Sequence, residues 1–380
     1  MTDANKRKFI GSKRARRITA ACLSAFIAIA ALVSVAWFAG LGTTERYVAD
    51  LVIDRSAPEG IETTKNAEYG YAEINVTRPD ELKILQLSDL HIGCGFLSVA
   101  EDKKLINEIV KCVNAVNPDL IAITGDALSP VFVTSGTRNS YRQTAVLTAL
   151  FEKLKVPYAF CFGNHDGDGT AGKAYVAEKL EAAPYSLFLR GDRSAGEGNY
   201  CVKVKFGGDL VSSLIFIDSG MSAGAGKYEG VSKSGVKSYE EIARKLKQEN
   251  PTASNLLFMH VPVPEYDDFY NAAKRGDPDY RLISGIKDEK VAYGEQNGLY
   301  DAIVKTDFTK WVFCGHDHKN NYSVKNETTG VTLCYGMSMD FSAYPTLRFK
   351  TGYRGGRVIK IAKSGEVTTF LVPQSNGYSA

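Results

Sequence analysis

Two histidines lie two residues apart in the segment VFCGHDHKNN, residues 312–321, directly behind an apolar run. On an extended segment, residues two apart point to the same side, so His316 and His318 could face one shared ligand while Asp317 points away. Ordinary surface or core imidazoles would give the same short motif, because such motifs also occur by chance. The chain holds only five histidines, so the positions of the other three decide between these interpretations.

The other histidines also stand where expected strands end. Polar residues able to bind a metal close five such strands, in the segments SDLHIG, TGD, GNHD, MHVP and GHDH. They are Asp89, His91, Asp126, Asn164, His165, Asp166, His260, His316 and His318. Histidines scattered through a core or a surface would have no reason to follow a strand each time. Ligands of α/β proteins gather outside the carboxyl ends of strands, so the pattern predicts one shared site.

The residue types in this set indicate metal binding. Imidazole, carboxylate and amide ligands suit divalent or trivalent ions such as Mn, Fe and Zn, and the absence of cysteine argues against a structural thiolate zinc site. The set exceeds the needs of one ion but suffices for two ions that share a carboxylate. Two ions about 3.5–4 Å apart clamp the attacking and leaving oxygens of phosphoryl transfer and hold a deprotonated water between them. The pattern therefore predicts phosphoester chemistry.

The elements that must position these residues alternate between strands and helices. Apolar runs predict strands at 82–89, 120–126, 158–166, 254–260 and 310–318. Helical spacing of apolar residues predicts helices at 102–116, 144–154, 238–249 and 298–304. Such alternation is typical of a layered α/β fold.

The end of the chain has a different pattern. The segments VTLCYG, GRVIKIA and EVTTFLVP, between residues 331 and 373, predict consecutive antiparallel strands that complete a sheet. The Gly- and Ser-rich region 184–236 offers only two expected strands, at 202–206 and 214–220.

The N-terminal region indicates a membrane segment. Seven basic residues lie within residues 1–17, and residues 18–42 carry no charge. This apolar length spans a bilayer, whereas a cleavable signal peptide usually has a shorter apolar part and an A-x-A-like cleavage site. We expect an uncleaved single-pass anchor, with a cleaved signal peptide as the main alternative. The positive-inside rule then predicts a cytoplasmic N-terminus and an extracytoplasmic catalytic domain, with a tether at 43–80 and the domain at 81–375.

Composition is that of an ordinary globular protein. Of the 380 residues, 44% are hydrophobic and 23% are charged, and the net charge is +3. Without its basic N-terminal run the chain is slightly acidic, so no nucleic-acid binding surface is expected. Seven cysteines are present without a C-x-x-C pair, and Cys161 and Cys314 lie in apolar runs. Free cysteine packs as a small hydrophobe in such places, so we expect mostly free, buried thiols.

The ordered motifs resemble those of the calcineurin-like metallophosphoesterases. That family has D-x-H, GD, GNHD or GNHE, a lone H and GHxH in this order, and the chain has DLH, GD, GNHD, MH and GHDH between residues 89 and 318. The flanking segments MHVPVPEY and GHDHKNNY further resemble the branch of fungal and plant phosphatases near purple acid phosphatases. The resemblance implies a four-layer α/β/β/α sandwich.

The resemblance also implies a role for each residue. Asp89, His91 and His318 would bind one ion, Asn164, His260 and His316 would bind the other, and Asp126 would bridge the pair. His165 would protonate the leaving oxygen or steady the phosphate, and Asp166 would orient it. Purple acid phosphatases instead have D-x-G and GDxxY motifs, whereas this chain has His91 and Ser129 at those points, so a tyrosinate-coloured ferric site is not expected.

These observations predict a membrane-anchored enzyme that hydrolyses phosphate esters with two divalent or mixed-valence metal ions. The alternative is a catalytically silent metal-binding scaffold or interaction module on the same fold. Monoester and diester substrates both remain open, because specificity lies in the loops 127–143, 167–200 and 265–297. Two arginine pairs are weaker candidates for gripping an anionic substrate, with solvated loops as the alternative: Arg138 and Arg142, and Arg354 and Arg357.

Overall fold

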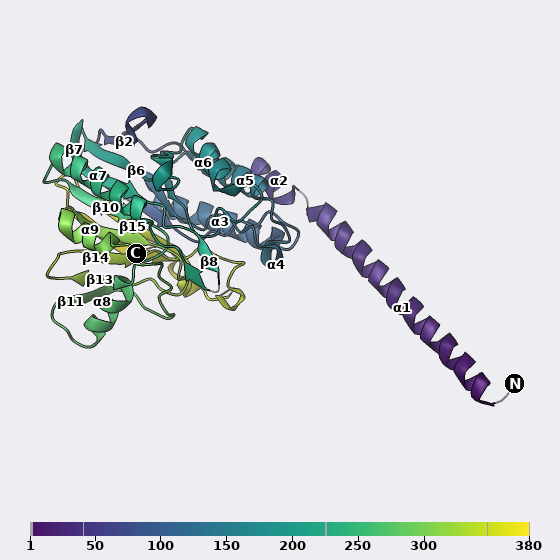
Figure 1. Ribbon diagram of the computed structural model, residues 1–380. Coiled ribbons are helices and arrows are strands. Elements are labelled where there is room, and N and C mark those ends of the chain that lie inside the picture. Colours follow the sequence, from purple (N-terminus) through teal and green to yellow (C-terminus); the bar gives the residue numbers. More distant parts are fainter. Residues whose placement is uncertain (1–2, 41, 225, 348, 380) are drawn as a thin grey trace.

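One long helix projects from a body of two sheets and surrounding helices (Figure 1). This computed structural model describes residues 3–40, 42–224, 226–347 and 349–379. The projecting helix is α1 (Asp3–Gly40). Its stretch Ala15–Val35 is long and apolar enough to cross a membrane or to serve as a signal sequence, and none of it is buried against the body.

The smaller sheet provides the first ligand-bearing strands. Among the described residues it has five strands in the order β16-β15-β3-β4-β5. The bounds are β3 (Leu82–Leu87), β4 (Leu120–Thr124), β5 (Tyr158–Cys161), β15 (Gly355–Ile361) and β16 (Val367–Pro373). Strands β3, β4 and β5 run parallel, and β15 joins β3 antiparallel. Their continuous apolar sequences suit a sheet that is covered on both faces.

The larger sheet has nine strands within the described residues, in the order β1-β2-β6-β7-β10-β12-β14-β13-β11. The bounds are β1 (Ile61–Asn66), β2 (Tyr71–Val76), β6 (Tyr200–Phe206), β7 (Asp209–Phe216), β10 (Ser254–Phe258), β11 (Tyr280–Ser284), β12 (Thr309–Cys314), β13 (Ser323–Asn326) and β14 (Thr332–Tyr335). Its central strands β7, β10, β12 and β14 are parallel. A separate hairpin pairs β8 (Ser222–Gly224) with β9 (Lys227–Tyr228).

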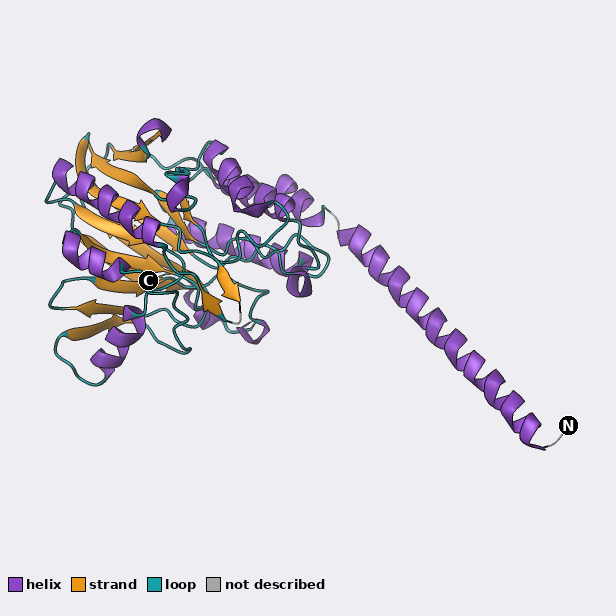
Figure 2. Ribbon diagram, in the orientation of Figure 1, coloured by secondary structure: helices purple, strands orange, loops and turns teal. Residues whose placement is uncertain are grey.

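Helices cover the outer faces of both sheets, and Figure 2 shows the strands between them. On the side of the smaller sheet lie α2 (Thr43–Asp50), α3 (Val99–Val116), α4 (Phe132–Ser135), α5 (Ser140–Leu154) and α6 (Gly172–Ala182). On the side of the larger sheet lie α7 (Lys233–Glu249), α8 (Glu265–Lys274) and α9 (Leu299–Thr306). Short 3-10 helices are η1 (Ala67–Tyr69), η2 (Arg193–Ala195), η3 (Pro345–Leu347), η4 (Thr351–Tyr353) and η5 (Gln374–Asn376).

Two apolar cores hold these layers together. The first core joins the two sheets to each other and to α3 and α5, and it includes Leu87, Phe160 and Phe258. The second core lies between the larger sheet and α7, α8 and α9, and it includes Leu257 and Ile303. Burial of large apolar side chains in both cores is the main force that stabilises such a layered arrangement. The predicted four-layer α/β/β/α fold is confirmed.

The predicted tether at 43–80 is wrong, because most of this stretch belongs to the body. Helix α2 contacts α3 and α5, and β1 and β2 extend the larger sheet, with β2 parallel to β6. In β2 the residues Ala72, Ile74 and Val76 are buried and alternate with partly exposed neighbours. This alternation has the period of a half-buried strand, but the segment is short and β1 has no such alternation.

The predicted run of antiparallel strands near the end of the chain is only partly correct. Strands β15 and β16 do form an antiparallel hairpin, but β14 lies in the other sheet, parallel to β12. The chain between Gly336 and Arg354 passes from one sheet to the other. The cysteine prediction is confirmed in the described part of the chain, where all seven are free and only Cys22, in α1, is exposed.

Candidate metal centre

The strand ends of both sheets meet at the predicted site. His260, after β10, places its Nδ1 2.8 Å from the carbonyl oxygen of Thr124 at the end of β4. The backbone N–H of His316, after β12, donates to both carboxylate oxygens of Asp89, after β3, at 3.2 Å. The two sheets are therefore joined through residues of the site itself.

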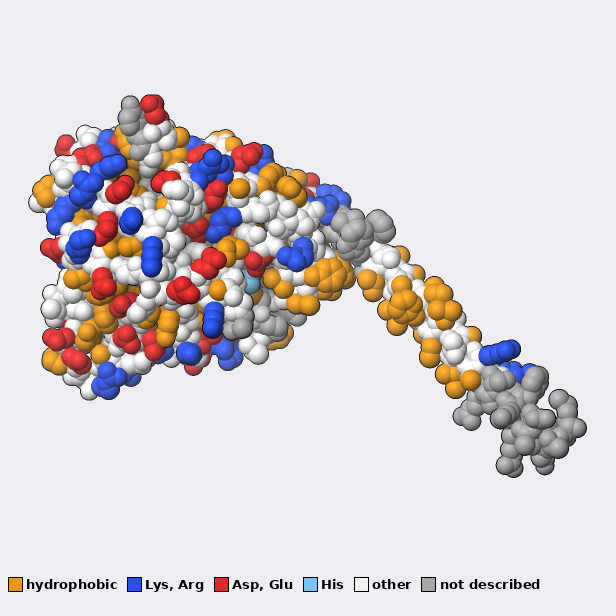
Figure 3. Space-filling model, in the orientation of Figure 1, with side chains coloured by type: hydrophobic (Ala, Val, Ile, Leu, Met, Phe, Trp, Pro, Cys, Tyr) orange, Lys and Arg blue, Asp and Glu red, His pale blue; other side chains and the backbone are white. Residues whose placement is uncertain are grey.

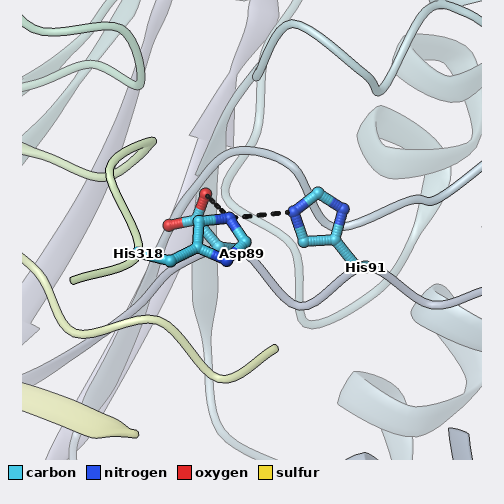
Figure 4. A group of neighbouring side chains, drawn as sticks. All are labelled: Asp89, His91 and His318. Atoms are coloured by element: carbon cyan, nitrogen blue, oxygen red, sulfur yellow. Dashed lines mark hydrogen bonds and ion pairs between the residues drawn. The ribbon is translucent and has the colours of Figure 1, made fainter. Parts of the chain in front are cut away.

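The first group of side chains is Asp89, His91 and His318, whose ligand atoms all lie within 4.8 Å of one another. Figure 4 shows the two rings and the carboxylate close together, with Asp89 and His91 on the loop after β3 and His318 on the loop after β12. His91 Nε2 and His318 Nε2 are 3.3 Å apart, and His318 Nε2 is 3.4 Å from Asp89 Oδ1. Such spacing between buried nitrogen and oxygen lone pairs suits a shared cation.

The second group is Asp126, His260 and His316, again with ligand atoms within 4.8 Å of one another. His260 Nε2 lies 3.3 Å from Asp126 Oδ2 and 3.3 Å from His316 Nδ1. The groups adjoin each other, because Asp126 Oδ2 is also 3.9 Å from His91 Nε2 and Asp89 Oδ1 is 4.0 Å from His260 Nε2. Asp126 thus lies between both sets of imidazoles, as a bridging carboxylate would.

The position of Asn164 is consistent with a metal ligand. Its amide Nδ2 donates to Ser222 Oγ at 3.2 Å, whereas its Oδ1 is buried without a hydrogen-bond partner among the described residues. His316 Nε2 is likewise a buried nitrogen without such a partner in the described chain. A buried, unpaired acceptor costs free energy unless something pairs with it, so a cation at Asn164 Oδ1 fits the donor set. The next residue, His165, donates its backbone N–H to Asp126 Oδ1 at 2.8 Å, which places Asn164 beside the second group.

Burial and neighbouring charges set the protonation of the imidazoles. Burial lowers the pKa of His91 to about 4 and that of His316 to about 3, so both rings are neutral near pH 7 and their lone pairs can bind a cation. Burial also acts to lower the pKa of His260, but Asp126 and Asp89 outweigh it and raise this pKa to about 9. A metal ion at this position would replace the proton of His260 and balance the negative charge of the two carboxylates.

The backbone at the site is strained. Asp89, His91, Asp126 and His316 have positive φ angles of 53°, 52°, 48° and 79°. Residues with a Cβ seldom adopt this left-handed conformation, and they cluster at functional sites where surrounding contacts enforce it. Gly163 is needed for a different reason, the close approach of two backbone segments, because a Cβ there would lie 2.2 Å from the backbone nitrogen of Asp126.

The partner of His165 differs from the predicted one. His165 Nδ1 lies 2.8 Å from Asp168 Oδ2, and both side chains are one-third exposed. The carboxylate of Asp166 is instead buried and accepts the backbone N–H groups of Asp126, Leu128 and Gly163. Burial and the charge of Asp126 raise the pKa of Asp166 to about 7. The prediction that Asp166 orients His165 is therefore wrong: Asp166 braces the two ligand loops, and Asp168 contacts the ring.

Asp340 is a site residue that the sequence patterns missed. Its Oδ2 lies 3.3 Å from His318 Nδ1, and its carboxylate also accepts the backbone N–H groups of Ser342, Ala343 and Tyr344. The ring of Tyr344 lies 4.2 Å from that of His318, between centroids. A carboxylate behind an imidazole ligand fixes the ring and its tautomer. Asp317 turns away from the site as predicted and accepts the hydroxyl of Tyr335 at 2.5 Å.

Arg354 and Arg357 neither contact substrate nor lie in a solvated loop, the two alternatives that the sequence left open. Both side chains are buried: Arg354 donates to the carbonyl oxygens of Asp340 and Leu347, and Arg357 donates to those of Tyr335 and Asn321. They tie the end of the chain to the loops around the site and are not available to substrate. In the other pair, Arg142 forms an ion pair with Glu45 at 2.9 Å, and Arg138 donates to the carbonyl oxygen of Asp168 at 2.6 Å.

Comparisons with known proteins agree with this geometry. Residues 82–320 match the model of the calcineurin-like phosphoesterase family. Phosphatase DCR2 of Saccharomyces cerevisiae is 27% identical over 303 residues, which cover 72% of this chain and 50% of that protein. Probable inactive purple acid phosphatase 14 of Arabidopsis thaliana is 26% identical over 313 residues, covering 73% and 75% respectively. This chain thus spans only half the length of the yeast relative.

Solved structures include a dimetal phosphatase from Danio rerio, which aligns with a TM-score of 0.48 at 10% identity over 78% of this chain and 99% of that one. The yeast and plant relatives confirm the branch that the segments around His260 and His318 resemble. The matched range contains every predicted ligand from Asp89 to His318 and covers more than half of the sequence. The chain therefore belongs to the calcineurin-like phosphoesterase family.

Proposed function

We propose that this protein is a phosphoesterase that uses two metal ions to hydrolyse phosphate mono- or diesters. The observation that carries the proposal is the adjacency of two candidate ligand groups, Asp89–His91–His318 and Asp126–His260–His316. Beside them, Asn164 Oδ1 is buried without a hydrogen-bond partner among the described residues. Asp89, His91 and His318 would hold one ion, and Asn164, His260 and His316 the other, with Asp126 shared. Mn, Fe and Zn all suit this donor set.

When bound, the two ions supply an activated water and neutralise charge that develops on the phosphoryl oxygens. The protein positions them through buried imidazoles and a shared carboxylate, so that little reorganisation is needed during reaction. His165 has a different task. Its ring is partly exposed beside the centre and is held through Nδ1 by Asp168, which leaves Nε2 to donate a proton to the departing oxygen or a hydrogen bond to the phosphate.

A catalytically silent metal-binding scaffold is the second candidate. The observation that favours it comes from other proteins and not from this chain: two similar plant proteins are named probable inactive purple acid phosphatases. The residues of this chain support activity instead, because six of the seven predicted ligands form two adjacent groups, Asn164 lies beside them, and His165 is held by a carboxylate although it is not needed as a ligand.

The two candidates are distinguished by metal-dependent turnover. The full-length protein in detergent would be stripped with a chelator and supplied singly with Mn, Fe or Zn, then assayed on an aryl phosphate monoester and a diester. We expect hydrolysis of at least one ester to appear only with metal. Binding of two ions without turnover of either ester would favour the scaffold.

We also propose that α1 anchors the protein with its N-terminus in the cytoplasm and its catalytic domain outside. The basic residues of 1–17 and the exposed apolar stretch Ala15–Val35 support this orientation. Protease added to spheroplasts should degrade the catalytic domain. Complete protection would reverse the topology, and a mature form that begins near residue 40 would identify a cleaved signal peptide.

A further inference from the structure

A small apolar patch lies exposed on two segments that follow the candidate ligands His91 and Asp126: the loop after β3 and the segment that includes the short helix α4. Leu97, Phe132 and Val133 are 48%, 58% and 80% exposed. The loops that carry them touch, because the backbone N–H of Leu97 donates to the carbonyl oxygen of Ser135 at 3.2 Å, and a Cβ on Gly136 would lie 3.2 Å from Leu97 Cγ. Single exposed apolar side chains are common, whereas contiguous ones mark contact surfaces.

The patch adjoins the point where α1 meets the body. A Cβ on Gly40, the last residue of α1, would lie 2.8 Å from Cα and Cβ of Phe96, and a Cβ on Gly136 would lie 2.6 Å from the ring of Phe96. Figure 1 shows α4, which begins with Phe132, at the corner from which α1 projects. Figure 3 shows hydrophobic side chains gathered at that corner. The patch and the end of the anchor are thus parts of one surface.

The geometry of α1 sets the height of this corner above a bilayer. The uncharged part of α1 runs from Ile18 to Gly40, which corresponds to roughly 35 Å at the rise of an α-helix. The hydrocarbon core is about 30 Å thick, and the headgroup layer on each side of it adds about 5–8 Å. Gly40, at the end of this uncharged part, therefore lies at the level of the headgroups, and Phe96 with it.

Basic and aromatic side chains accompany the patch. Arg46 and Arg138 are exposed, Tyr141 is 47% exposed, and a Cβ on Gly42, just after α1, would lie 3.2 Å from the guanidinium of Arg46. Arginine near the surface attracts anionic lipid headgroups, and tyrosine is enriched at membrane interfaces. Three apolar side chains are too few for a stable protein–protein interface, which buries about 800 Å² on each partner. The composition suits a lipid surface better than a second copy of the chain.

The same loops form the rim of the metal centre. Leu97 follows His91 by six residues, and Phe132 follows Asp126 by six. A β-bridge joins Ile92 to Leu128, and Gln143 Nε2 donates to the carbonyl oxygens of both Gly93 and Ser129. The two loops are therefore bonded to each other beside the ligands, and whatever the patch touches is held next to the site.

We propose that the patch Leu97–Phe132–Val133, flanked by Arg46 and Arg138, is a second membrane contact that docks on the bilayer crossed by α1. The inference rests on the proposed anchoring. It places the rim of the metal centre at the level of the lipid headgroups, where the domain would not tumble freely on the end of its anchor.

The test uses the full-length protein in vesicles of phosphatidylcholine and phosphatidylglycerol. Cys22→Ser removes the exposed cysteine in α1, and a single cysteine is then introduced by Val133→Cys and labelled with a polarity-sensitive dye. The matched control is Val304→Cys on α9, which is 42% exposed in the wild type and lies across the body from α1 (Figure 1). We expect lipids brominated in their acyl chains to quench the label at residue 133 at least several-fold more than the label at residue 304.

A third sample, with native Cys22 labelled, reports separately on the anchor. Quenching at residue 22 without quenching at residue 133 would overturn the docking and leave the anchor intact. A label at residue 133 that responds to dilution of the protein in the vesicles, and not to brominated lipid, would show contact between copies and would also overturn it. Absence of quenching at both positions would refute anchor and docking together, whereas quenching at residue 133 alone would support docking without a span.

Discussion

The buried ligand cluster and the partly exposed pair His165–Asp168, called the His165 corner below, contain the same residue types in different environments. His91, His260, His316 and His318 are at most 8% exposed and lie among carboxylates. His165 lies at the rim, one-third exposed, with a single carboxylate on its Nδ1. A buried imidazole with its lone pair directed at its neighbours is suited to holding a cation, whereas an accessible one with an oriented ring is suited to moving a proton.

This difference predicts which substitutions cause loss of metal and which slow the reaction while the metal stays bound. Substitutions in the cluster should act through metal content and affect all substrates alike. Substitutions at the corner should leave the metal in place and depend on the leaving group. Substitutions of Asp126, His165, Asp340 and Asp168 test this division.

Asp126→Asn should have the largest effect. Its carboxylate lies 3.3 Å from His260 and 3.9 Å from His91, so the neutral amide removes charge from both ion positions. We expect metal analysis of the purified variant to show a loss well beyond one ion, with activity reduced by about 10³-fold or more, since metal ions supply several kcal/mol of transition-state stabilisation. Two tightly held ions and normal turnover would contradict the bridging role.

His165→Ala should lower activity without releasing metal. A general acid contributes roughly 10²–10⁴-fold, and most when the leaving group is poor. We expect a large loss on an alkyl phosphate and a clearly smaller loss on a nitrophenyl ester, because nitrophenolate departs almost without a proton.

His260→Ala and His316→Ala are the matched controls, which should cripple hydrolysis of both esters through loss of metal. Equal losses on the two esters with metal retained would make His165 a phosphate-binding residue. Depleted metal in the His165 variant would make it a ligand.

The ligand cluster was predictable because each member follows an apolar strand. Strands β3, β4 and β5 of the smaller sheet and β10 and β12 of the larger sheet all end at the site. The positions of Asp168 and Asp340 were not predictable. Asp166 is the nearer neighbour of His165 in sequence, but three backbone amides turn its carboxylate into the ligand loops. Asp340 is 22 residues beyond His318 and comes close only because the chain crosses from one sheet to the other after β14.

The fold was predictable to a similar extent. Strands with continuous apolar sequence and helices with apolar spacing appear where their periods predict them. The errors at 43–80 and at β14 have one cause, since pairing partners far apart in the chain decide which sheet takes a short strand. The burial of the arginines was unpredictable for the same reason. Arg357 donates to the carbonyl oxygens of Tyr335 and Asn321, which are far from it in the sequence.

Asp340→Asn should have an intermediate effect on the cluster. The carboxylate lies 3.3 Å from His318 Nδ1, and an amide there no longer fixes the charge behind the ring. Carboxylates behind metal-bound imidazoles typically contribute about 10–100-fold in metal affinity. We expect titration to show one ion weakened by that factor and the other little changed. Equal weakening of both ions would mean that the 340–344 loop supports the whole centre and not the His318 ligand alone.

Asp168→Asn should have the smallest effect and should belong to the corner. Asp168 Oδ2 lies 2.8 Å from His165 Nδ1, but both groups are one-third exposed, so water can partly replace the lost charge. We expect metal content and thermal stability to stay unchanged, with activity on an alkyl phosphate reduced by roughly 10-fold, the lower end of what partners behind functional histidines contribute. The nitrophenyl ester should be hydrolysed at nearly the normal rate.

Asp166→Asn is the matched comparison, because the buried carboxylate of Asp166 accepts three backbone N–H groups. Its loss should lower the melting temperature and reduce hydrolysis of both esters equally. If Asp168→Asn also affected both esters equally, or if Asp166→Asn alone showed the leaving-group dependence, Asp166 would regain the orienting role that the geometry assigns to Asp168.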